Sequence, residues 1–301
     1  KALGVDYTTP LGSQCAATAS SLIAVTPDGQ RSMNTYLGAC RELTPDDVFA
    51  HEIADAGITY IEGYLWDEPA AKDASRKAMT LAHEAGNKIA LTLSDSFCVG
   101  RFRDEFLDLF HKEVDILFAN AGIQAFRPIL DMEDADWHDQ IDVNLSGTCN
   151  AIRAVAPYLV KNGGGRIIVT SSTQGQHGTK YGAAYSASKW GIIGLMKSAA
   201  LELGQYGITV NAIVPGLIDT PLTRHRQRYA QAIDDLDNAE PLGKLEAEAK
   251  QKLAAKSPLG VPWLPPESIA PAVVFLASDE ASMVSGATYD VTGGDSANIT
   301  A

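Results

Sequence analysis

Hydrophobic and polar residues change their spacing near residue 44 of the sequence. Before that point, SLIAVTPDGQRSMNTYL (residues 21–37) holds two short β-rich runs around the turn Pro27-Asp28-Gly29, which predicts a small β region. After it, continuous apolar runs alternate with segments in which apolar residues recur every three or four positions. This alternation predicts strands and helices that follow one another as β-α-β units.

The predicted elements continue to the end of the sequence. Apolar runs predict strands over residues 58–66, 88–95, 114–120, 165–172, 208–216 and 286–294. Helical spacing predicts helices over residues 44–57, 69–86, 100–112, 134–161 and 183–206, the first of them capped by Thr44 with Pro45 in its first turn. Residues 223–258 are polar and helical, and form either a lid over the strand ends or a solvated excursion.

Repeated β-α-β units imply a parallel sheet with helices on both faces, because each crossover is right-handed. We therefore expect an α/β fold, namely a doubly wound, Rossmann-like parallel sheet in three α/β/α layers with a small N-terminal β appendage. Three regions are expected: the β appendage (1–43), a first set of β-α units (44–113) and a catalytic part (114–301), with 44–301 forming one continuous sheet. Ligands of such sheets bind at the carboxyl ends of the strands.

The net charge of the chain excludes some classes of binding partner. The 301 residues carry a formal net charge of −13, and such an acidic surface repels nucleic-acid phosphates and anionic lipids. No apolar run reaches the roughly 18 residues of a membrane helix, and the first residues, KALGVDYTTPLG, lack the apolar core of a signal peptide. We expect a cytoplasmic protein without nucleic-acid or membrane partners.

Cysteine and histidine spacing gives no sign of a metal. The cysteines form no CxxC pair, and none of the 6 histidines has ligand spacing with cysteines or carboxylates. The expectation is therefore no metal site, no disulfide framework, and free thiols at the following four positions: Cys15, Cys40, Cys98 and Cys149.

A group of residues suited to proton transfer stands in the second half. Ser172 ends an apolar strand, Tyr185 follows 13 positions later, and Lys189 lies one helical turn beyond it on the same face. A phenol has a pKa near 10, and an adjacent ammonium favours its phenolate form. Tyr185 can then exchange a proton with an alcohol or carbonyl oxygen that Ser172 hydrogen-bonds, while a nicotinamide supplies the hydride.

The joint pattern is more specific than the pair Tyr185 and Lys189. NAGI at residues 120–123, Asn144, Ser172, Tyr185, Lys189 and PGLIDT at residues 215–220 together resemble the short-chain dehydrogenase/reductase family over about residues 111–301. The resemblance implies an NAD or NADP cofactor, a small-molecule alcohol or carbonyl substrate, and a homo-oligomer paired through the helix that carries Tyr185 and the helix before it.

The resemblance also implies residue roles. The implied catalytic residues are Asn144 (proton relay), Ser172 (substrate oxygen), Tyr185 (acid/base) and Lys189 (tuning of Tyr185). The implied cofactor-binding residues are Asn120, Ala121, Gly122, Tyr185, Lys189, Pro215, Gly216, Ile218 and Thr220.

The first half departs from this family. The glycine-rich turn T-G-x-x-x-G-x-G, which would seat the cofactor pyrophosphate at a helix N-terminus, does not occur before residue 114. Instead, the β region at 21–37, ITYIEGYLWD and KIALTLSDSFCVGRF resemble ribokinase-like sugar and nucleoside kinases over about residues 5–120. The sequence is thus interpreted as a chimera, in which the loop SDSFCVGRF offers Arg101 to an anion while Asp95 repels it.

Three functions stay open at this point. The first is an NAD(P)-dependent enzyme that interconverts a secondary alcohol and a ketone, and the second is a folded but catalytically silent chimera without a cofactor phosphate loop. The third is a sugar or nucleoside kinase. Its closing motif is only approximated by DVTGGDS at residues 290–296, so Asp295 is expected to be a terminal turn residue. The sequence leaves open the choice between NAD and NADP.

Overall fold

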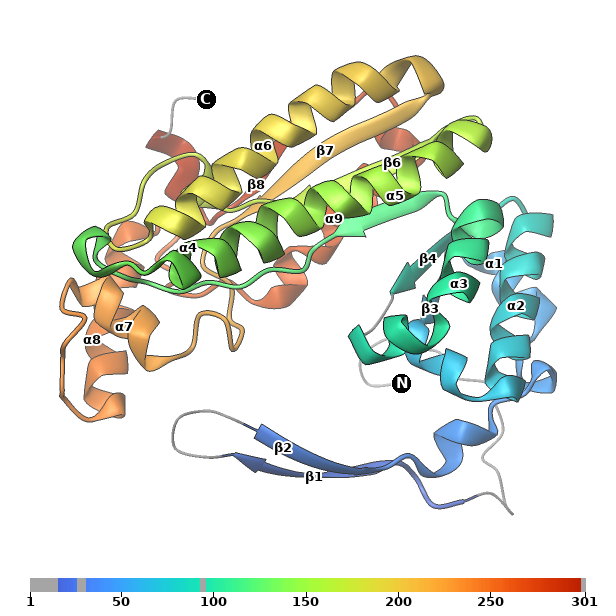
Figure 1. Cartoon of the computed structure of the whole chain (residues 1–301), viewed down its shortest axis with the longest axis horizontal. Helices are drawn as coiled ribbons and strands as arrows, with labels where there is room; N and C mark the ends of the chain where they lie inside the picture. Colours follow the sequence, from blue (N-terminus) through green and yellow to red (C-terminus); the bar gives the residue numbers. More distant parts are fainter. Residues whose placement is uncertain (1–15, 26–30, 93–95, 299–301) are drawn as a thin grey trace. The chain divides into compact units, whose positions relative to one another are not determined.

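The computed structural model describes residues 16–25, 31–92 and 96–298, which divide after Val114 into two compact units (Figure 1). The unit boundary lies one residue from the 113/114 boundary expected from the sequence. Cys15, the turn Pro27-Asp28-Gly29 and Asp95 lie outside the described residues. Each unit is described here by itself.

The first unit contains two small sheets. Strands β1 (Ser20–Val25) and β2 (Arg31–Tyr36) form an antiparallel pair, as the β-rich runs predicted. Strands β3 (Ile58–Glu62) and β4 (Lys88–Thr92) form a parallel pair in which Ile58 faces Lys88. The helices of this unit are α1 (Ala50–Asp55), α2 (Pro69–Glu84) and α3 (Ser96–Glu113).

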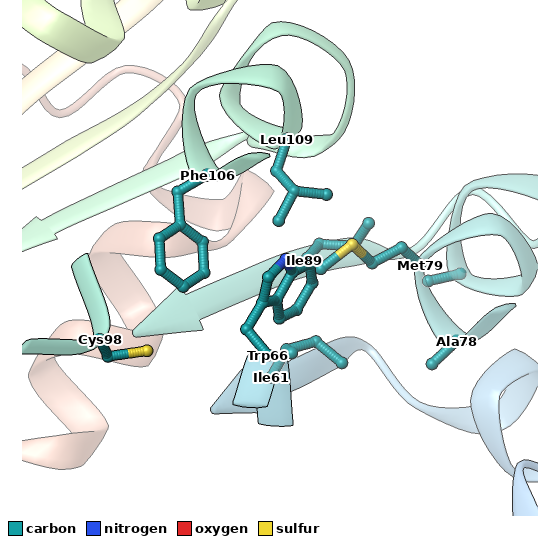
Figure 2. Close-up of a cluster of buried hydrophobic side chains, with 9 residues drawn as sticks. Ile61, Trp66, Ala78, Met79, Ile89, Cys98, Phe106 and Leu109 are labelled. Atoms are coloured by element: carbon teal, nitrogen blue, oxygen red, sulfur yellow. The ribbon is translucent and has the colours of Figure 1, made fainter. Parts of the chain in front are cut away.

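The first unit has its own apolar core around Trp66, whose side chain is fully buried (Figure 2). The ring of Trp66 lies against that of Phe106 from α3, with 5.4 Å between the ring centroids. Ile61 and Ile89 reach the same cluster from the two parallel strands, and α2 contributes Met79. The buried members of this core come from residues 61–109, and Val48 and Ile53 pack against it from the preceding segment.

Two predicted elements of this unit are shorter in the structure. The strand expected over 58–66 ends at Glu62, and a 3₁₀ turn (Gly63–Asp67) carries Trp66 into the core, where its large apolar surface is removed from water. The helix expected over 44–57 is a 3₁₀ turn (Pro45–Asp47) followed by α1. Thr44 caps this turn as predicted, because its backbone nitrogen and hydroxyl both donate to Asp47 Oδ2 at 2.9 Å.

The second unit is a parallel four-stranded sheet in the order β5-β6-β7-β8 (Figure 1). Its strands are β5 (Ile116–Ala119), β6 (Gly165–Thr170), β7 (Ile208–Pro215) and β8 (Thr288–Val291). Its helices are α4 (Asp134–Gln140), α5 (Gly147–Lys161), α6 (Ala183–Leu203), α7 (Arg226–Ile233), α8 (Leu242–Lys256) and α9 (Ala270–Ala277).

Helices cover both faces of this sheet. Helices α5 and α6 lie on the face toward the viewer in Figure 1, and α9 lies on the other face, where Leu276 packs against Ile168 and Ile213. Strand β7 is buried along nearly its whole length, as a strand covered on both faces must be. The predicted Rossmann-like α/β fold, with a parallel sheet between two helical layers, is confirmed.

The parallel strands are described within each unit, as the sheets β3-β4 in the first and β5-β6-β7-β8 in the second. One continuous sheet over 44–301 stays a prediction. The first sheet closes around Trp66, and the second closes around Ile168 and Ile213. Each parallel sheet is therefore covered by apolar residues of its own unit.

Two predicted helical stretches of the second unit also differ. The helix expected over 134–161 contains a π-helical turn (Ile141–Ser146) between α4 and α5. The stretch at 223–258 is α7 and α8, which pack on each other through Tyr229 and Leu245 and against Trp263. None of the described helices is both long and apolar enough to cross a membrane.

Candidate active site

A cavity of about 660 Å³ opens where all four strands of the second unit end. Asn120, Ala121 and Gly122 line it after β5, and Thr292 lines it after β8. The residues that end β6 and β7 complete this edge: Thr170, Ser171, Ser172, Pro215 and Gly216. The cavity thus lies at the carboxyl edge of the sheet, where the fold was expected to bind its ligand.

Ser172 and Tyr185 meet in this cavity. Ser172 caps the 3₁₀ turn Thr173–Gly175, and its hydroxyl oxygen accepts a hydrogen bond from the backbone nitrogen of Gln174 at 3.2 Å. Tyr185 stands in the first turn of α6, is 6% exposed, and lies near the Ser172 side chain, which acts on its pKa. Burial raises the pKa of Tyr185 to about 12, against the lowering by Ser172 and by the charge of Arg228. The phenol is therefore protonated at neutral pH.

Lys189 lies one turn along α6 from Tyr185, as predicted. Its Nζ donates to the carbonyl oxygen of Thr170 at 2.9 Å and stands 5.5 Å from the centre of the Tyr185 ring. Burial lowers the pKa of Lys189 to about 8. The groups that lower the pKa of Tyr185 are Ser172 and Arg228, and the tuning of Tyr185 by Lys189 stays a prediction.

Asn144 does not line the cavity, although it supports a segment that does. Its side chain is fully buried in the π-helical turn. The amide oxygen accepts from the backbone nitrogen of Ile123 at 2.8 Å, and the amide nitrogen donates to the carbonyl of Ile123 and to Ser188 Oγ, both at 3.0 Å. The amide therefore holds the turn that contains Gly122.

Close packing around two glycines shapes the cavity wall. A Cβ on Gly122 would lie 3.2 Å from Asn144 Oδ1 and 3.4 Å from Lys189 Nζ. A Cβ on Gly216 would lie 2.9 Å from the Cα of Thr292, so only glycine lets the end of β7 pass β8 at this distance. Ile218 and Thr220, the other predicted residues of the PGLIDT segment, line the same cavity. The structure therefore brings every predicted cofactor-binding residue to this one site.

The stretch at 223–258 contributes residues that sequence analysis missed. Arg228 and Gln231 of α7 and Leu253 of α8 line the cavity, so the interpretation as a solvated excursion is wrong and the stretch lies over the site. Arg228 had a signal in the sequence: it stands four positions before Ala232, on the buried face of α7. Gln174 and Asp295 also line the cavity, Asp295 from the terminal turn in which it was expected.

Polar atoms without partners point to a bound ligand. Gln174 Oε1 and Arg228 Nε are buried, line this cavity through their side chains, and have no hydrogen-bond partner. The Lys189 ammonium has three donors, of which one is used by Thr170. These groups suit the ribose and amide of a nicotinamide nucleoside.

Arg101, the predicted anion ligand, already has a partner. It is paired with Asp67, with 2.8 Å between the guanidinium and the carboxylate. The described residues contain no cluster of three His, Cys, Asp or Glu side chains suited to a metal ion. The residues that line the cavity of the second unit fit the nicotinamide end of the cofactor.

The comparisons with known proteins agree on one family. Residues 50–230 match the family model described as short chain dehydrogenase. The chain is 36% identical over 181 residues to the 3-oxoacyl-[acyl-carrier-protein] reductase FabG of Thermotoga maritima, a match that covers 60% of this chain and 65% of the relative. It is 33% identical over 231 residues to the (3R)-3-hydroxyacyl-CoA dehydrogenase of Mus musculus, covering 76% of this chain and 79% of that protein.

Solved structures show the same fold. The carveol dehydrogenase of Mycobacterium avium, in complex with NAD, aligns with a TM-score of 0.59 and 31% identity over 76% of this chain and 81% of that one. The chain spans less than two thirds of the length of the Thermotoga reductase, of which 65% is covered. The family match begins at residue 50, inside the region that resembles ribokinase-like proteins.

Proposed function

The chain belongs to the short-chain dehydrogenase family, and we propose that it is an NAD(P)-dependent oxidoreductase that interconverts a secondary alcohol and a ketone. One observation carries the proposal: Tyr185 and Ser172 lie together in the cavity at the carboxyl edge of the sheet, with the Lys189 ammonium over the phenol ring, 5.5 Å from its centre. A hydroxyl pair of this kind is suited to exchange one proton with a bound oxygen.

In the direction of reduction, Tyr185 is the proton donor. Its pKa of about 12 keeps the phenol protonated at neutral pH, so a proton is present on the side chain that faces the cavity. Ser172 hydrogen-bonds the same substrate oxygen and holds it near the phenol. In the direction of oxidation, Tyr185 accepts the proton of the alcohol, and the cation of Arg228 stabilises the phenolate that forms.

The nicotinamide cofactor, when bound, supplies or accepts the hydride. Lys189 and Tyr185 are the side chains that would hold its ribose, and Asn120, Ala121 and Gly122 follow β5 beside it. Pro215, Gly216, Ile218 and Thr220 would hold the carboxamide side. The carveol dehydrogenase with NAD supports a nicotinamide dinucleotide for this chain, and the reductase and dehydrogenase relatives support alcohol and carbonyl chemistry.

Replacement of Tyr185 by Phe tests this function. The ring keeps its volume while the proton donor is lost, so we expect kcat for ketone reduction to fall by about 10²–10⁴-fold and the melting temperature to stay close to that of the parent. NAD(P)H oxidation by both proteins against a panel of cyclic and open-chain ketones is the measurement. Equal turnover in the Tyr185→Phe variant would show that the proposed proton donor is wrong.

The silent chimera is the second candidate, and the missing glycine-rich turn favours it. It predicts a folded protein, and neither the parent nor the Tyr185→Phe variant then turns over any ketone of the panel.

We also propose that residues 5–120 derive from a ribokinase-like protein. The quoted strings support this origin, while the short chain dehydrogenase match from residue 50 opposes it. Superposition of residues 16–114 alone on both families decides between them.

A homo-oligomer paired through α5 and α6 is proposed as well. Trp190 and Leu201 of α6 are 51% and 86% exposed, which is costly for large apolar side chains in water. Light scattering of the purified chain should give a multiple of its 32.0 kDa mass. A Leu201→Glu variant that stays oligomeric argues against this helix pair.

Cytoplasmic location is likewise a proposal. Cys40 and Cys149 are thiols outside any disulfide, which suits a reducing compartment. Labelling of the thiols in intact and lysed cells tests it, because thiols in a reducing compartment react fully after lysis without prior reduction.

A further inference from the structure

Arg228 is the one arginine of its segment whose guanidinium lacks an anionic or carbonyl partner. Arg224 pairs with Asp219 and Glu246 at 2.7 and 2.8 Å. Arg226 donates to the carbonyl oxygens of residues 238 and 240 at 3.1 and 3.0 Å. Arg228, by contrast, donates only to the neutral amide oxygen of Gln231. It makes no ion pair within the described residues.

The position of Arg228 makes this lack costly. Its side chain is 9% exposed and lines the cavity that contains Tyr185 and Ser172. Its Nε is buried without a partner. A guanidinium has five N–H donors, and burial removes the water that they bind. One neutral acceptor does not compensate for this lost hydration. Proteins retain such a group where a ligand completes its hydrogen bonds.

The groups around Arg228 leave room for an anion. Phe126 lies beside it, with 5.8 Å from the guanidinium carbon to the ring centroid, and Tyr185 and Asp295 act on it electrostatically. Asp295 is the acidic side chain among the described residues that line the cavity, and it is exposed rather than hydrogen-bonded to Arg228. The planar guanidinium therefore presents free donors of the geometry that binds a carboxylate through two parallel hydrogen bonds.

We propose that Arg228 binds a carboxylate of the substrate, so that the substrates of this site are oxo acids and the corresponding hydroxy acids. The inference rests on the proposed function, because Tyr185 and Ser172 fix where the reacting oxygen lies. Arg228 lines the same cavity, so one small molecule reaches both ends. Leu217, Leu222, Leu253 and Val261 line the cavity as well, and they suit an apolar carbon skeleton between the two polar ends.

Steady-state kinetics with matched neutral and anionic substrates tests the proposal. The probes are 2-oxopentanoate and 4-oxopentanoate, each with its methyl ester, and the proteins are the parent, Arg228→Met, Arg228→Lys and Arg226→Met. We expect the parent to prefer at least one acid over its ester by about tenfold or more. Arg228→Met should lower kcat/KM about 100-fold more for that acid than for its ester, mainly through KM, because the loss of the charge that acts on Tyr185 affects both substrates alike.

The variants separate a contact with substrate from an effect on Tyr185. Arg228→Lys keeps the charge but not the paired donors, so it should recover part of the lost acid preference. Arg226→Met, the exposed neighbour on the same helix, should leave both substrates unchanged. If Arg228→Met lowers kcat/KM by the same factor for acid and ester, or if the parent prefers no acid, the proposal is overturned.

A binding measurement that needs no turnover keeps this test independent of the proposed function. Pentanoate carries the carboxylate without a reacting carbonyl, and pentanamide is its neutral match. Calorimetric titration, with and without NADH, should show pentanoate binding that weakens at least about tenfold in Arg228→Met, and weaker binding of pentanamide. Pentanoate binding without any turnover would leave the carboxylate site standing while the proposed function fails. Absence of pentanoate binding in both conditions, or loss of NADPH rather than pentanoate binding in Arg228→Met, overturns the carboxylate proposal.

Discussion

Tyr185, Ser172 and Arg228 together set the protonation state of the phenol. Tyr185 is buried and protonated, and both Ser172 and Arg228 lower its pKa. Lys189 donates to the carbonyl oxygen of Thr170 and lies over the phenol ring, so it positions α6 against the end of β6 and offers donors to a ligand.

The buried ammonium of Lys189 makes stability depend on pH. Its pKa falls from 10.5 to about 8 on folding, so between these values the unfolded chain binds more protons than the folded one. Stability from this group therefore rises as pH increases from 8 to 10.5, by up to about 3 kcal/mol. We expect the melting temperature of the parent to rise relative to that of Lys189→Met as the pH increases from 8 to 10.5. Melting curves of both proteins between pH 7 and 11 are the measurement.

The exposed Lys197 on the same helix is the matched control for that experiment. Lys197→Met should change the melting temperature by the same small amount at every pH. A gap between the parent and Lys189→Met that stays constant from pH 7 to 11 contradicts a lowered pKa for Lys189.

At the scale of elements, the site depends on how closely the turn after β6 approaches α6. Ser171 Oγ donates to the carbonyl oxygen of Lys189 at 2.9 Å, and Gly175 lies in the 3₁₀ turn between the two catalytic hydroxyls. A Cβ on Gly175 would lie 2.3 Å from Ser171 Oγ and 2.7 Å from the Lys189 carbonyl oxygen. Only glycine therefore lets Ser172 and Tyr185 come together.

Replacement of Gly175 by Ala should separate these two elements. The added methyl group overlaps backbone atoms of α6, and overpacking of this kind costs about 1–3 kcal/mol. We expect a lower melting temperature and a loss of ketone reduction through kcat. Gly194→Ala on α6, where a Cβ meets no atom within 4 Å, should keep activity and stability. Full activity of Gly175→Ala would contradict the close approach.

Local sequence signals predicted much of the secondary structure. They failed where a residue distant in the sequence determines the local structure. The cap at Thr44, the alternation of strands and helices, and the meeting of Ser172, Tyr185 and Lys189 follow from spacing within short segments. The π-helical turn at Asn144 does not, because it depends on hydrogen bonds to Ile123, 21 residues away. Arg228 was missed for the same reason: its cavity partners lie on other elements.

At the scale of the molecule, the described residues form two units, each closed around its own core. The buried members of the core around Trp66 come from residues 61–109, and the core around Ile168 and Ile213 draws on the second unit. Periodicity predicted the strands of both sheets but could not predict which strands pair, since strand pairing depends on contacts that sequence spacing does not encode.

Separate cores predict separate thermal transitions. Trp66 and Ile168 are both fully buried, and Trp66→Ala and Ile168→Ala should each cost about 2–5 kcal/mol. Differential scanning calorimetry should show that each variant lowers a different transition of the same protein. A single transition that both variants lower together contradicts independent cores.

The account as a whole depends on whether this chain binds a nicotinamide dinucleotide without a glycine-rich turn in its first half. The most direct measurement is equilibrium titration of the parent with NADH and with NADPH, followed by nicotinamide fluorescence. The account predicts that at least one of them binds with Kd near or below about 100 µM, a free energy of about −5.5 kcal/mol, and that Lys189→Met weakens it. No binding of either dinucleotide at millimolar concentration contradicts the account.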